Sequence, residues 1–154
     1  MHPKAGQTVT NRYISEMFNV CAQRGIRYSG SLKTGIKHVV LITALHKTPE
    51  DLIRNPYKDR KINNRLLYTG EGRFGDQKME RGNWVLKQQM EKKYPLYVFE
   101  KKSPGKYVFL GPFRVLSVQE EIQKDSHGRE RRVFLYELCK FESQTSKNKL
   151  RHHS

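Results

Sequence analysis

The stretch that decides the fold is residues 96–138, LYVFEKKSPGKYVFLGPFRVLSVQEEIQKDSHGRERRVFLYEL. Its apolar runs are short and rich in β-branched and aromatic residues, which predicts strands at 96–99, 107–110, 113–118 and 132–138. Turn formers separate these runs at Ser103-Pro-Gly105, at Gly111-Pro112 and at a polar hairpin tip, 124–128. Short strands in series, joined by tight turns, predict a strongly curved sheet or a partly closed barrel.

The first half of the chain adds helices to this sheet. Apolar residues at helical spacing behind a capping residue predict three helical segments: 8–25 behind Thr10, 47–56 behind Thr48, and one from Asn83 to Lys93. Further strands are expected at 38–44 and 66–69, and a basic loop rich in Gly and Ser at 25–35. The pattern predicts one α+β domain over residues 1–142, with two or three helices beside the sheet, and a basic flexible tail, 143–154.

The charge of the chain indicates a polyanionic partner. The chain contains 30 Lys and Arg but 15 Asp and Glu, which gives a formal net charge of +15 and a pI of about 10.0. Lys and Arg that neutralise phosphates release counterions, so nucleic acid is the leading candidate. Charge alone leaves DNA, RNA and an anionic membrane surface open.

Other classes of protein find little support. The two cysteines, Cys21 and Cys139, are isolated in sequence, which favours a reducing cytosol over a disulfide scaffold or a zinc site. The chain has neither a signal-peptide pattern at its start nor 18 consecutive apolar residues, so we expect a soluble cytoplasmic protein that does not enter a membrane. Asp51 with Glu100 matches a metal-dependent nuclease only loosely. We therefore expect no catalytic residues, metal or cofactor.

Residues 55–83 hold the most unusual chemistry. Tyr57 and Tyr68 flank a lone acid, Asp59, in a segment rich in cations and turn formers. A nucleobase flipped out of DNA is stacked on its faces and read on its Watson–Crick edge, and a carboxylate can accept a hydrogen bond from the exocyclic amine of cytosine. Two tyrosines and an acid suit that task. A purely structural interpretation is also possible, in which the tyrosines are half-buried core residues and Asp59 pairs with Arg60 or Lys61. The residue types alone leave both interpretations open.

The order of motifs in this stretch resembles a known family. Tyr57-x-Asp59, Leu67-Tyr-Thr-Gly-Glu-Gly72, Gly75-Asp-Gln77 and Gly82-Asn83-x-x-Leu86 are similar to the SRA (SET- and RING-associated) domains, in particular the SRA-like modules of McrA-type modification-dependent restriction endonucleases. The resemblance extends from about Val9 to about Phe141. It implies a PUA-like curved β-barrel that flips 5-methylcytosine or 5-hydroxymethylcytosine out of DNA.

The resemblance also implies a role for each matching residue. Tyr57 and Tyr68 would stack on the base, Asp59 would accept from the cytosine edge, and Thr69 and Gly70 would lie beside the 5-substituent. Tyr28 or Leu32 would fill the gap left in the DNA. The full set expected to contact DNA is Arg27, Tyr28, Ser29, Leu32, Lys33, Lys58, Arg60, Lys61 and Arg73. The residues expected to support the pocket are Asp76, Gln77 and Asn83.

Three functions remain as hypotheses. The first is a non-catalytic reader of double-stranded DNA carrying modified cytosine, in the cytosol of a bacterium or archaeon, with a nuclease domain or effector subunit as its partner. The second is a PUA-like RNA-binding module, since such barrels and a high positive charge also serve RNA. The third is a compact nuclease that uses Asp51 and Glu100.

Overall fold

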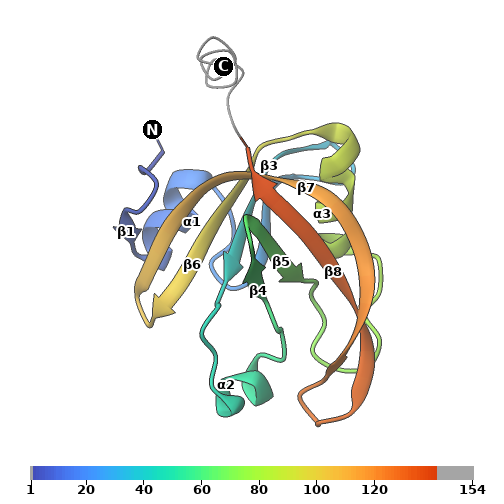
Figure 1. The fold of residues 1–154 in the computed structure, drawn as a ribbon. Coiled ribbons are helices and arrows are strands. Elements are labelled where there is room, and N and C mark those ends of the chain that lie inside the picture. The colour runs from blue at the N-terminus through green and yellow to red at the C-terminus, as the bar shows by residue number, and fades with distance from the viewer. Residues whose placement is uncertain (1, 142–154) are drawn as a thin grey trace, which may run out of the picture.

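The computed structural model describes residues 2–141, which form one strongly curved sheet with three helices around it (Figure 1). Its strands are β1 (Thr8–Val9), β2 (Ile26–Ser31), β3 (Gly35–Thr43), β4 (Arg60–Ile62), β5 (Arg65–Thr69), β6 (Leu96–Ser103), β7 (Lys106–Lys124) and β8 (Glu130–Lys140). Its helices are α1 (Asn11–Phe18), α2 (Pro49–Arg54) and α3 (Arg81–Lys92). The predicted α+β fold, a curved sheet flanked by two or three helices, is confirmed.

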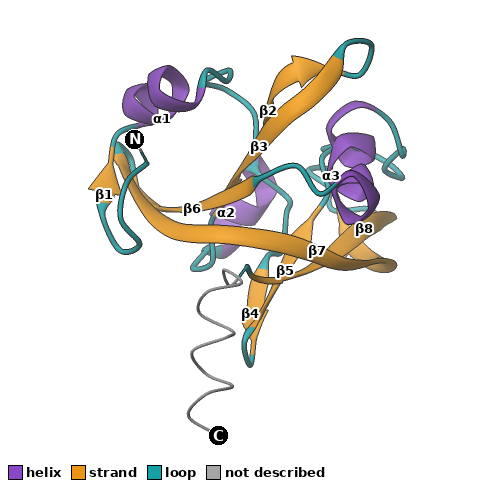
Figure 2. Cartoon of the chain, turned by 90° about the horizontal axis from the view of Figure 1, so that it is seen from above, coloured by secondary structure: helices purple, strands orange, loops and turns teal. Residues whose placement is uncertain are grey.

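One long strand organises the sheet. The strand order is β2-β3-β6-β7-β8-β5-β4, with β1 paired to β7, and only β3 and β6 run parallel. The 19 residues of β7 pair with β1 and β6 at one end and with β8 along the rest, so β7 spans the molecule in Figure 2. Between Val115 and Ser117, β7 has one extra residue, Leu116, opposite Leu138 and Glu137. Such a bulge bends a strand and increases its twist.

The helices cover two different faces of the sheet. Successive side chains of a strand point to opposite faces, and β3 shows the result. Val39 and Leu41 belong to the core cluster that α3 completes with Val85 and Leu86. Val40 belongs instead to the cluster that α1 completes with its buried residues Ile14 and Phe18. Because β3 is buried on both faces, its sequence is a continuous apolar run.

The structure corrects several predicted element boundaries. The first helix ends at Phe18, not at residue 25, because Asn19 takes a left-handed conformation and its N–H bonds Ser15. Glu80, not Asn83, occupies the N-cap position of α3. Gly111-Pro112 does not end a strand, because Gly111 has a positive φ of 111° and β7 continues through both residues. The short strand β4 was missed.

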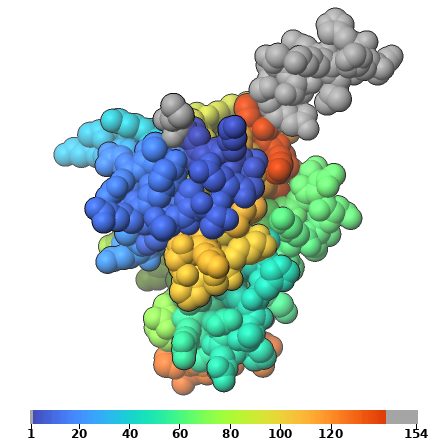
Figure 3. All heavy atoms as spheres, turned by 90° about the vertical axis from the view of Figure 1, so that its left-hand side faces the viewer, coloured from blue at the N-terminus to red at the C-terminus, as the bar shows by residue number. Residues whose placement is uncertain are grey.

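The predicted loop 25–35 is mostly a β-hairpin. Residues Ile26–Ser31 pair with β3, and a register shift after Ser29 accommodates Gly30, whose φ is 93°. A Cβ on Gly30 would lie 2.2 Å from the Gly35 carbonyl oxygen, so only glycine fits there. In Figure 3 this hairpin projects from the upper part of the molecule, whereas the α2 segment lies at the lower end.

Candidate functional site

A cavity of about 430 Å³ opens where β3 and β5 end. Its walls come from the ends of those two strands, from the α1–β2 connection, and from the segment between β3 and β4. All five residues predicted to form the base pocket line it: Tyr57, Asp59, Tyr68, Thr69 and Gly70. We call this cavity the pocket. The fold thus brings together two stretches, 57–59 and 68–70, that the sequence motif placed ten residues apart.

Asp59 is the buried acid of the pocket. It is 9% exposed; its Oδ2 accepts from the Thr43 hydroxyl at 2.6 Å, and its Oδ1 accepts from the Thr69 N–H at 2.7 Å. Burial raises the pKa of Asp59, and the hydrogen bonds from Thr43 and Thr69 oppose that rise. The two donors fix the orientation of the carboxylate, and each of its oxygens keeps a lone pair for a further donor.

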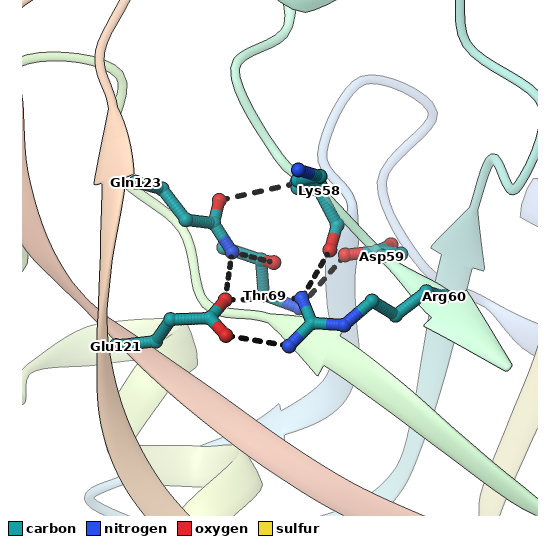
Figure 4. Close-up of polar contacts among 6 residues, drawn as sticks. All are labelled: Lys58, Asp59, Arg60, Thr69, Glu121 and Gln123. Atoms are coloured by element: carbon teal, nitrogen blue, oxygen red, sulfur yellow. Dashed lines mark hydrogen bonds and ion pairs between the residues drawn. The ribbon is translucent and has the colours of Figure 1, made fainter. Parts of the chain in front are cut away.

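Arg60, which follows Asp59 in sequence, forms its ion pair with Glu121 and not with Asp59. Arg60 forms a two-point ion pair with Glu121 of β7, at 3.0 and 2.5 Å, so the alternative in which Arg60 neutralises Asp59 is wrong (Figure 4). Gln123, two residues along β7, donates to Thr69 Oγ1 at 3.1 Å and to Glu121 at 2.8 Å. Its Oε1 accepts from the Lys58 N–H at 3.2 Å. Strand β7 therefore braces the pocket from outside.

The two tyrosines differ in exposure. Tyr68 is 4% exposed and part of the core, and burial raises its pKa well above the ordinary value. Gly25 approaches it closely, since a Cβ on Gly25 would lie 2.9 Å from the Tyr68 hydroxyl. Tyr57 is half-buried, and its hydroxyl accepts from the Gly72 N–H at 3.4 Å. Burial also raises the pKa of Tyr57, so both phenols are neutral at neutral pH.

A half-buried cation, Lys47, and a buried one, Arg131, hold the segment that carries Tyr57. The Lys47 ammonium donates to the carbonyls of Asn55 and Tyr57 at 3.0 and 2.9 Å, and it lies 5.5 Å from the Tyr57 ring centre. Burial lowers the pKa of Lys47. Arg131, 3% exposed, donates to the carbonyl of Pro56 at 3.2 Å and to that of Gly72 at 2.6 Å. These contacts fix the pocket wall, and no local sequence signal pointed to Lys47 or Arg131.

Two of the three predicted support residues, Asp76 and Gln77, belong to the loop that follows β5, and the third, Asn83, lies on α3. Gln77 Nε2 donates to the Gly70 carbonyl at 2.5 Å, and Asn83 Oδ1 accepts from the Glu71 N–H at 2.8 Å. A Cβ on Gly70 would lie 2.7 Å from Asn83 Oδ1 and 2.8 Å from Gln77 Oε1, so these amides leave room only for glycine. Asp76 Oδ1 accepts from the Arg132 N–H at 2.8 Å and ties the same loop to β8.

Four residues predicted to contact DNA from segment 27–33 do not line the pocket: Tyr28, Ser29, Leu32 and Lys33. Leu32, 51% exposed, and Lys33 lie at the tip of the β2–β3 hairpin, and β3 runs about 26 Å from that tip to Thr43. Tyr28 packs against the core and Ser29 is buried. Residues Ile26–Ser31 thus form a strand paired with β3 rather than an irregular loop, and the contact of this segment with DNA stays a prediction.

Arg27 lines the pocket, but its guanidinium already donates hydrogen bonds to other groups of the protein. It is 4% exposed, and it donates to Asn11 Oδ1 at 2.6 Å and to the Arg24 carbonyl at 2.5 Å. Of the other predicted contacts, Lys58 and Arg73 are exposed beside the pocket loops, whereas Lys61 lines a separate groove.

Different exposed residues surround the pocket. Gln23 and Arg24 line it from the α1–β2 connection, and Lys101 lines it from β6. Phe74, in the loop after β5, is 53% exposed and packs against His127 in a tilted arrangement with ring centres 4.6 Å apart. None of these four was singled out from the sequence. Arg24, Lys101 and Phe74 are exposed cations or an exposed aromatic residue and Gln23 is an exposed amide, and exposed residues of such types occur in many places along the chain.

The described part of the chain, residues 2–141, has neither clustered metal ligands nor a long apolar helix. Within that range there is no group of three or more His, Cys, Asp or Glu placed to hold a metal ion. None of the helices in the same range has the length and apolarity needed to cross a bilayer. The predicted tail, 143–154, lies outside the described residues.

Solved structures share this fold. The sulfur-binding and SRA domains of ScoMcrA, complexed with phosphorothioated DNA, align with a TM-score of 0.71 at 21% identity over 93% of this chain. This chain spans 41% of that one. The SUVH5 SRA domain aligns in a complex with fully methylated CG DNA (TM-score 0.67, 24% identity, 92% of this chain and 90% of that one). It also aligns in a complex with fully hydroxymethylated CG DNA (0.67, 22%, 94% and 94%).

Sequence comparison identifies the family. No curated protein matches the chain. The model of the SRA domain of ScoMcrA-like proteins matches residues 11–151, which is most of the chain. This match confirms the resemblance drawn from the motif between Tyr57 and Leu86, including its link to McrA-type proteins. The chain belongs to the ScoMcrA-like SRA domain family.

Proposed function

We propose that this SRA domain reads duplex DNA that contains 5-modified cytosine, and that it takes the flipped base into the pocket. One observation carries the proposal. The Asp59 carboxylate, held by Thr43 and Thr69, lies in a cavity of about 430 Å³ that Tyr57 and Tyr68 also line.

Each part of the pocket matches a requirement of base recognition. A carboxylate accepts from the exocyclic amine of cytosine, which thymine lacks, so Asp59 selects the class of base. Tyr57 and Tyr68 supply aromatic surface, and stacking contributes roughly 1–3 kcal/mol per base. That range is comparable to the few kcal/mol needed to flip a base. Thr69 and Gly70 form the wall beside the 5-position, where Gly70 adds no side chain.

The neighbouring structures support the choice of partner. SRA domains of SUVH5 are solved with methylated and hydroxymethylated DNA, and ScoMcrA domains with phosphorothioated DNA. We assign no catalytic step to this domain. It acts as a specificity module in the cytosol, and cleavage belongs to a nuclease domain or effector subunit, as expected for a module of a restriction system.

The test is a binding titration with matched duplexes. Each carries cytosine, 5-methylcytosine, 5-hydroxymethylcytosine or a phosphorothioate at one position, and fluorescence anisotropy is measured at two salt concentrations. We expect tighter binding to the 5-modified duplexes, with a preference that survives the salt increase. Equal affinity for modified and unmodified duplexes would refute the proposal. Stronger competition by structured RNA than by modified duplex would favour the RNA-binding alternative.

Variants connect that preference to the pocket. Tyr57→Ala removes a stacking surface, so we expect the affinity for modified duplex to fall about 5- to 150-fold. Tyr13→Ala is the matched control, since Tyr13 is also a half-buried tyrosine but lies on α1 outside the pocket. It should leave the preference intact.

A further inference from the structure

A second concave surface lies at the other end of β5. It has a volume of about 720 Å³ and is lined by the β4–β5 turn, the end of α3, and the facing parts of β7 and β8. We call it the distal groove. Figure 3 shows the β4–β5 turn projecting beside the end of β8. The distal groove shares no lining residue with the pocket, and β5 runs about 14 Å from Arg65 at the groove to Thr69 at the pocket.

The distal groove is lined by cations and by no acid. Its charged residues are Lys61, Arg65, Lys93, Arg114 and Lys140, and all five are exposed. Arg65 has a long contact of 3.8 Å to Glu137. Within residues 2–141, the other four form no ion pair. The pocket differs, because Asp59 and Glu71 stand among its four Lys and Arg.

The sheet itself sets the spacing of these charges. Arg114 on β7 and Arg65 on β5 both pair with Cys139 of β8, so the three residues lie in one row across the sheet. Neighbouring strands are about 4.8 Å apart, which puts the two arginine backbones about 10 Å from each other on one face. Like charges this close repel, and a bound polyanion would relieve the repulsion.

We propose that the distal groove binds the phosphate backbone of a second DNA segment, so that one SRA domain bridges two stretches of DNA. The groove suits backbone contact, because exposed Lys and Arg neutralise phosphates without reading bases. Asn63 and Asn64, in the β4–β5 turn that lines the groove, supply amide donors for phosphate or sugar oxygens. Duplex DNA is favoured over RNA because the family's solved complexes contain DNA.

A capture experiment tests bridging. A duplex with 5-methylcytosine is immobilised and saturated with the protein, and a labelled unmodified duplex is then added. The variant Arg65→Gln/Arg114→Gln/Lys140→Gln should bind the first duplex but capture at least about tenfold less of the second. The control Lys4→Gln/Lys37→Gln/Lys87→Gln removes three exposed charges from outside both surfaces and should capture as the wild type does. Equal capture by both variants would overturn the proposal.

Stoichiometry excludes a simpler route to bridging. Sedimentation of the mixed complex should give one protein copy between two duplexes. Two copies would assign bridging to protein dimers and overturn the role of the groove. Preferential displacement of the labelled duplex by structured RNA would overturn the assignment to DNA.

The capture step rests on the proposed function, because the pocket holds the first duplex. The salt dependence of binding to unmodified duplex tests the groove without relying on the pocket. The logarithm of the affinity for unmodified duplex falls with the logarithm of salt concentration by about 0.9 per phosphate contact. The groove variant should show a slope shallower by two to three such contacts, and the control variant a slope within one contact of the wild type. An unchanged slope would refute the groove whether or not the pocket reads modified bases.

Discussion

The two ends of β5 use polar residues in opposite ways. At the pocket end, Asp59 is buried and both of its oxygens accept hydrogen bonds from the protein. At the distal end, Arg114 and Lys140 are exposed and have no carboxylate partner among residues 2–141. Buried, fixed groups discriminate between ligands because a wrong ligand leaves them unpaired. Exposed cations add affinity without sequence preference. Under the two proposals, the pocket end therefore supplies specificity and the distal end supplies attraction.

The largest effect should follow removal of the pocket acid. Asp59→Ala leaves the Thr69 N–H and the Thr43 hydroxyl without their acceptor, at a cost of about 1–3 kcal/mol in the free energy of unfolding for each buried group. It also removes the acceptor for the cytosine amine, so the preference for modified cytosine should disappear. Chemical denaturation and anisotropy measure the two effects. Full preference in a folded Asp59→Ala protein would show that specificity arises elsewhere.

A smaller effect is expected at Gly70. The Cβ introduced by Gly70→Ala would lie within 3 Å of the amide oxygens of Asn83 and Gln77. Asn83 Oδ1 accepts from the Glu71 N–H in the loop, and Gln77 Oε1 accepts from the Phe134 N–H of β8. Such overpacking costs typically 1–3 kcal/mol, and the shifted loop should weaken binding of modified duplex. Gly35→Ala is the control, since it meets open space and tests only the cost of a positive φ. Equal loss of modified-base preference in both variants would contradict this role for Gly70.

The pH dependence of stability should carry the signature of Asp59. Burial raises the folded-state pKa of Asp59 above its ordinary value of 3.8, so the ionised form destabilises the folded state at pH values above that raised pKa. This penalty disappears as the pH falls through the raised pKa toward 3.8. Asp59→Asn, which cannot ionise, should therefore gain on the wild type in melting temperature as the pH rises through this window. A melting-temperature difference that does not change with pH would contradict the assignment.

The smallest effect is expected for a single cation of the distal groove. Arg114→Gln should reduce the salt slope of binding by about 0.9 and leave the ratio of affinities for modified and unmodified duplex unchanged. The slope and the ratio come from one set of titrations. A changed ratio would mean that the distal groove takes part in base recognition, and the contrast between the two ends would fail.

The sequence predicted those parts of the molecule that depend on local patterns. Thr10 and Thr48 cap helices as expected. The apolar runs from Leu96 onward became strands, and the motif from Tyr57 to Gly70 came together in one cavity. The failures have two causes. The end of the first helix and the start of α3 depend on the local backbone at Asn19 and Glu80, whereas the predicted loop 25–35 depends on pairing between two strands. Nothing near Ser29 in sequence shows that it pairs with His38 of β3.

The candidate site shows the same division. Gln123 and Arg131 reach the pocket only because β7 and β8 pair in one register across the sheet. They lie more than 50 residues from Thr69 in sequence. In the sequence, nothing distinguishes Lys47 from other lysines that follow a strand. Its two acceptors, the carbonyls of Asn55 and Tyr57, come near its ammonium only when segment 55–57 folds back. Short motifs identified part of the cavity lining, Tyr57, Asp59 and residues 68–70, and long-range pairing decided what supports it.

The bulge at Leu116 has a consequence for how this domain tolerates length changes. One strand, β7, carries Arg114 on one side of the bulge and Gln123 on the other. Their partners on β8, Cys139 and Arg131, are eight residues apart, and residues an even number apart in a strand lie on one face. Deletion of Leu116 would leave Arg114 and Gln123 eight residues apart as well, so regular pairing would keep both side chains on their present face. The deletion would therefore remove the local bend in β7 while keeping the arginine row and the register of Gln123.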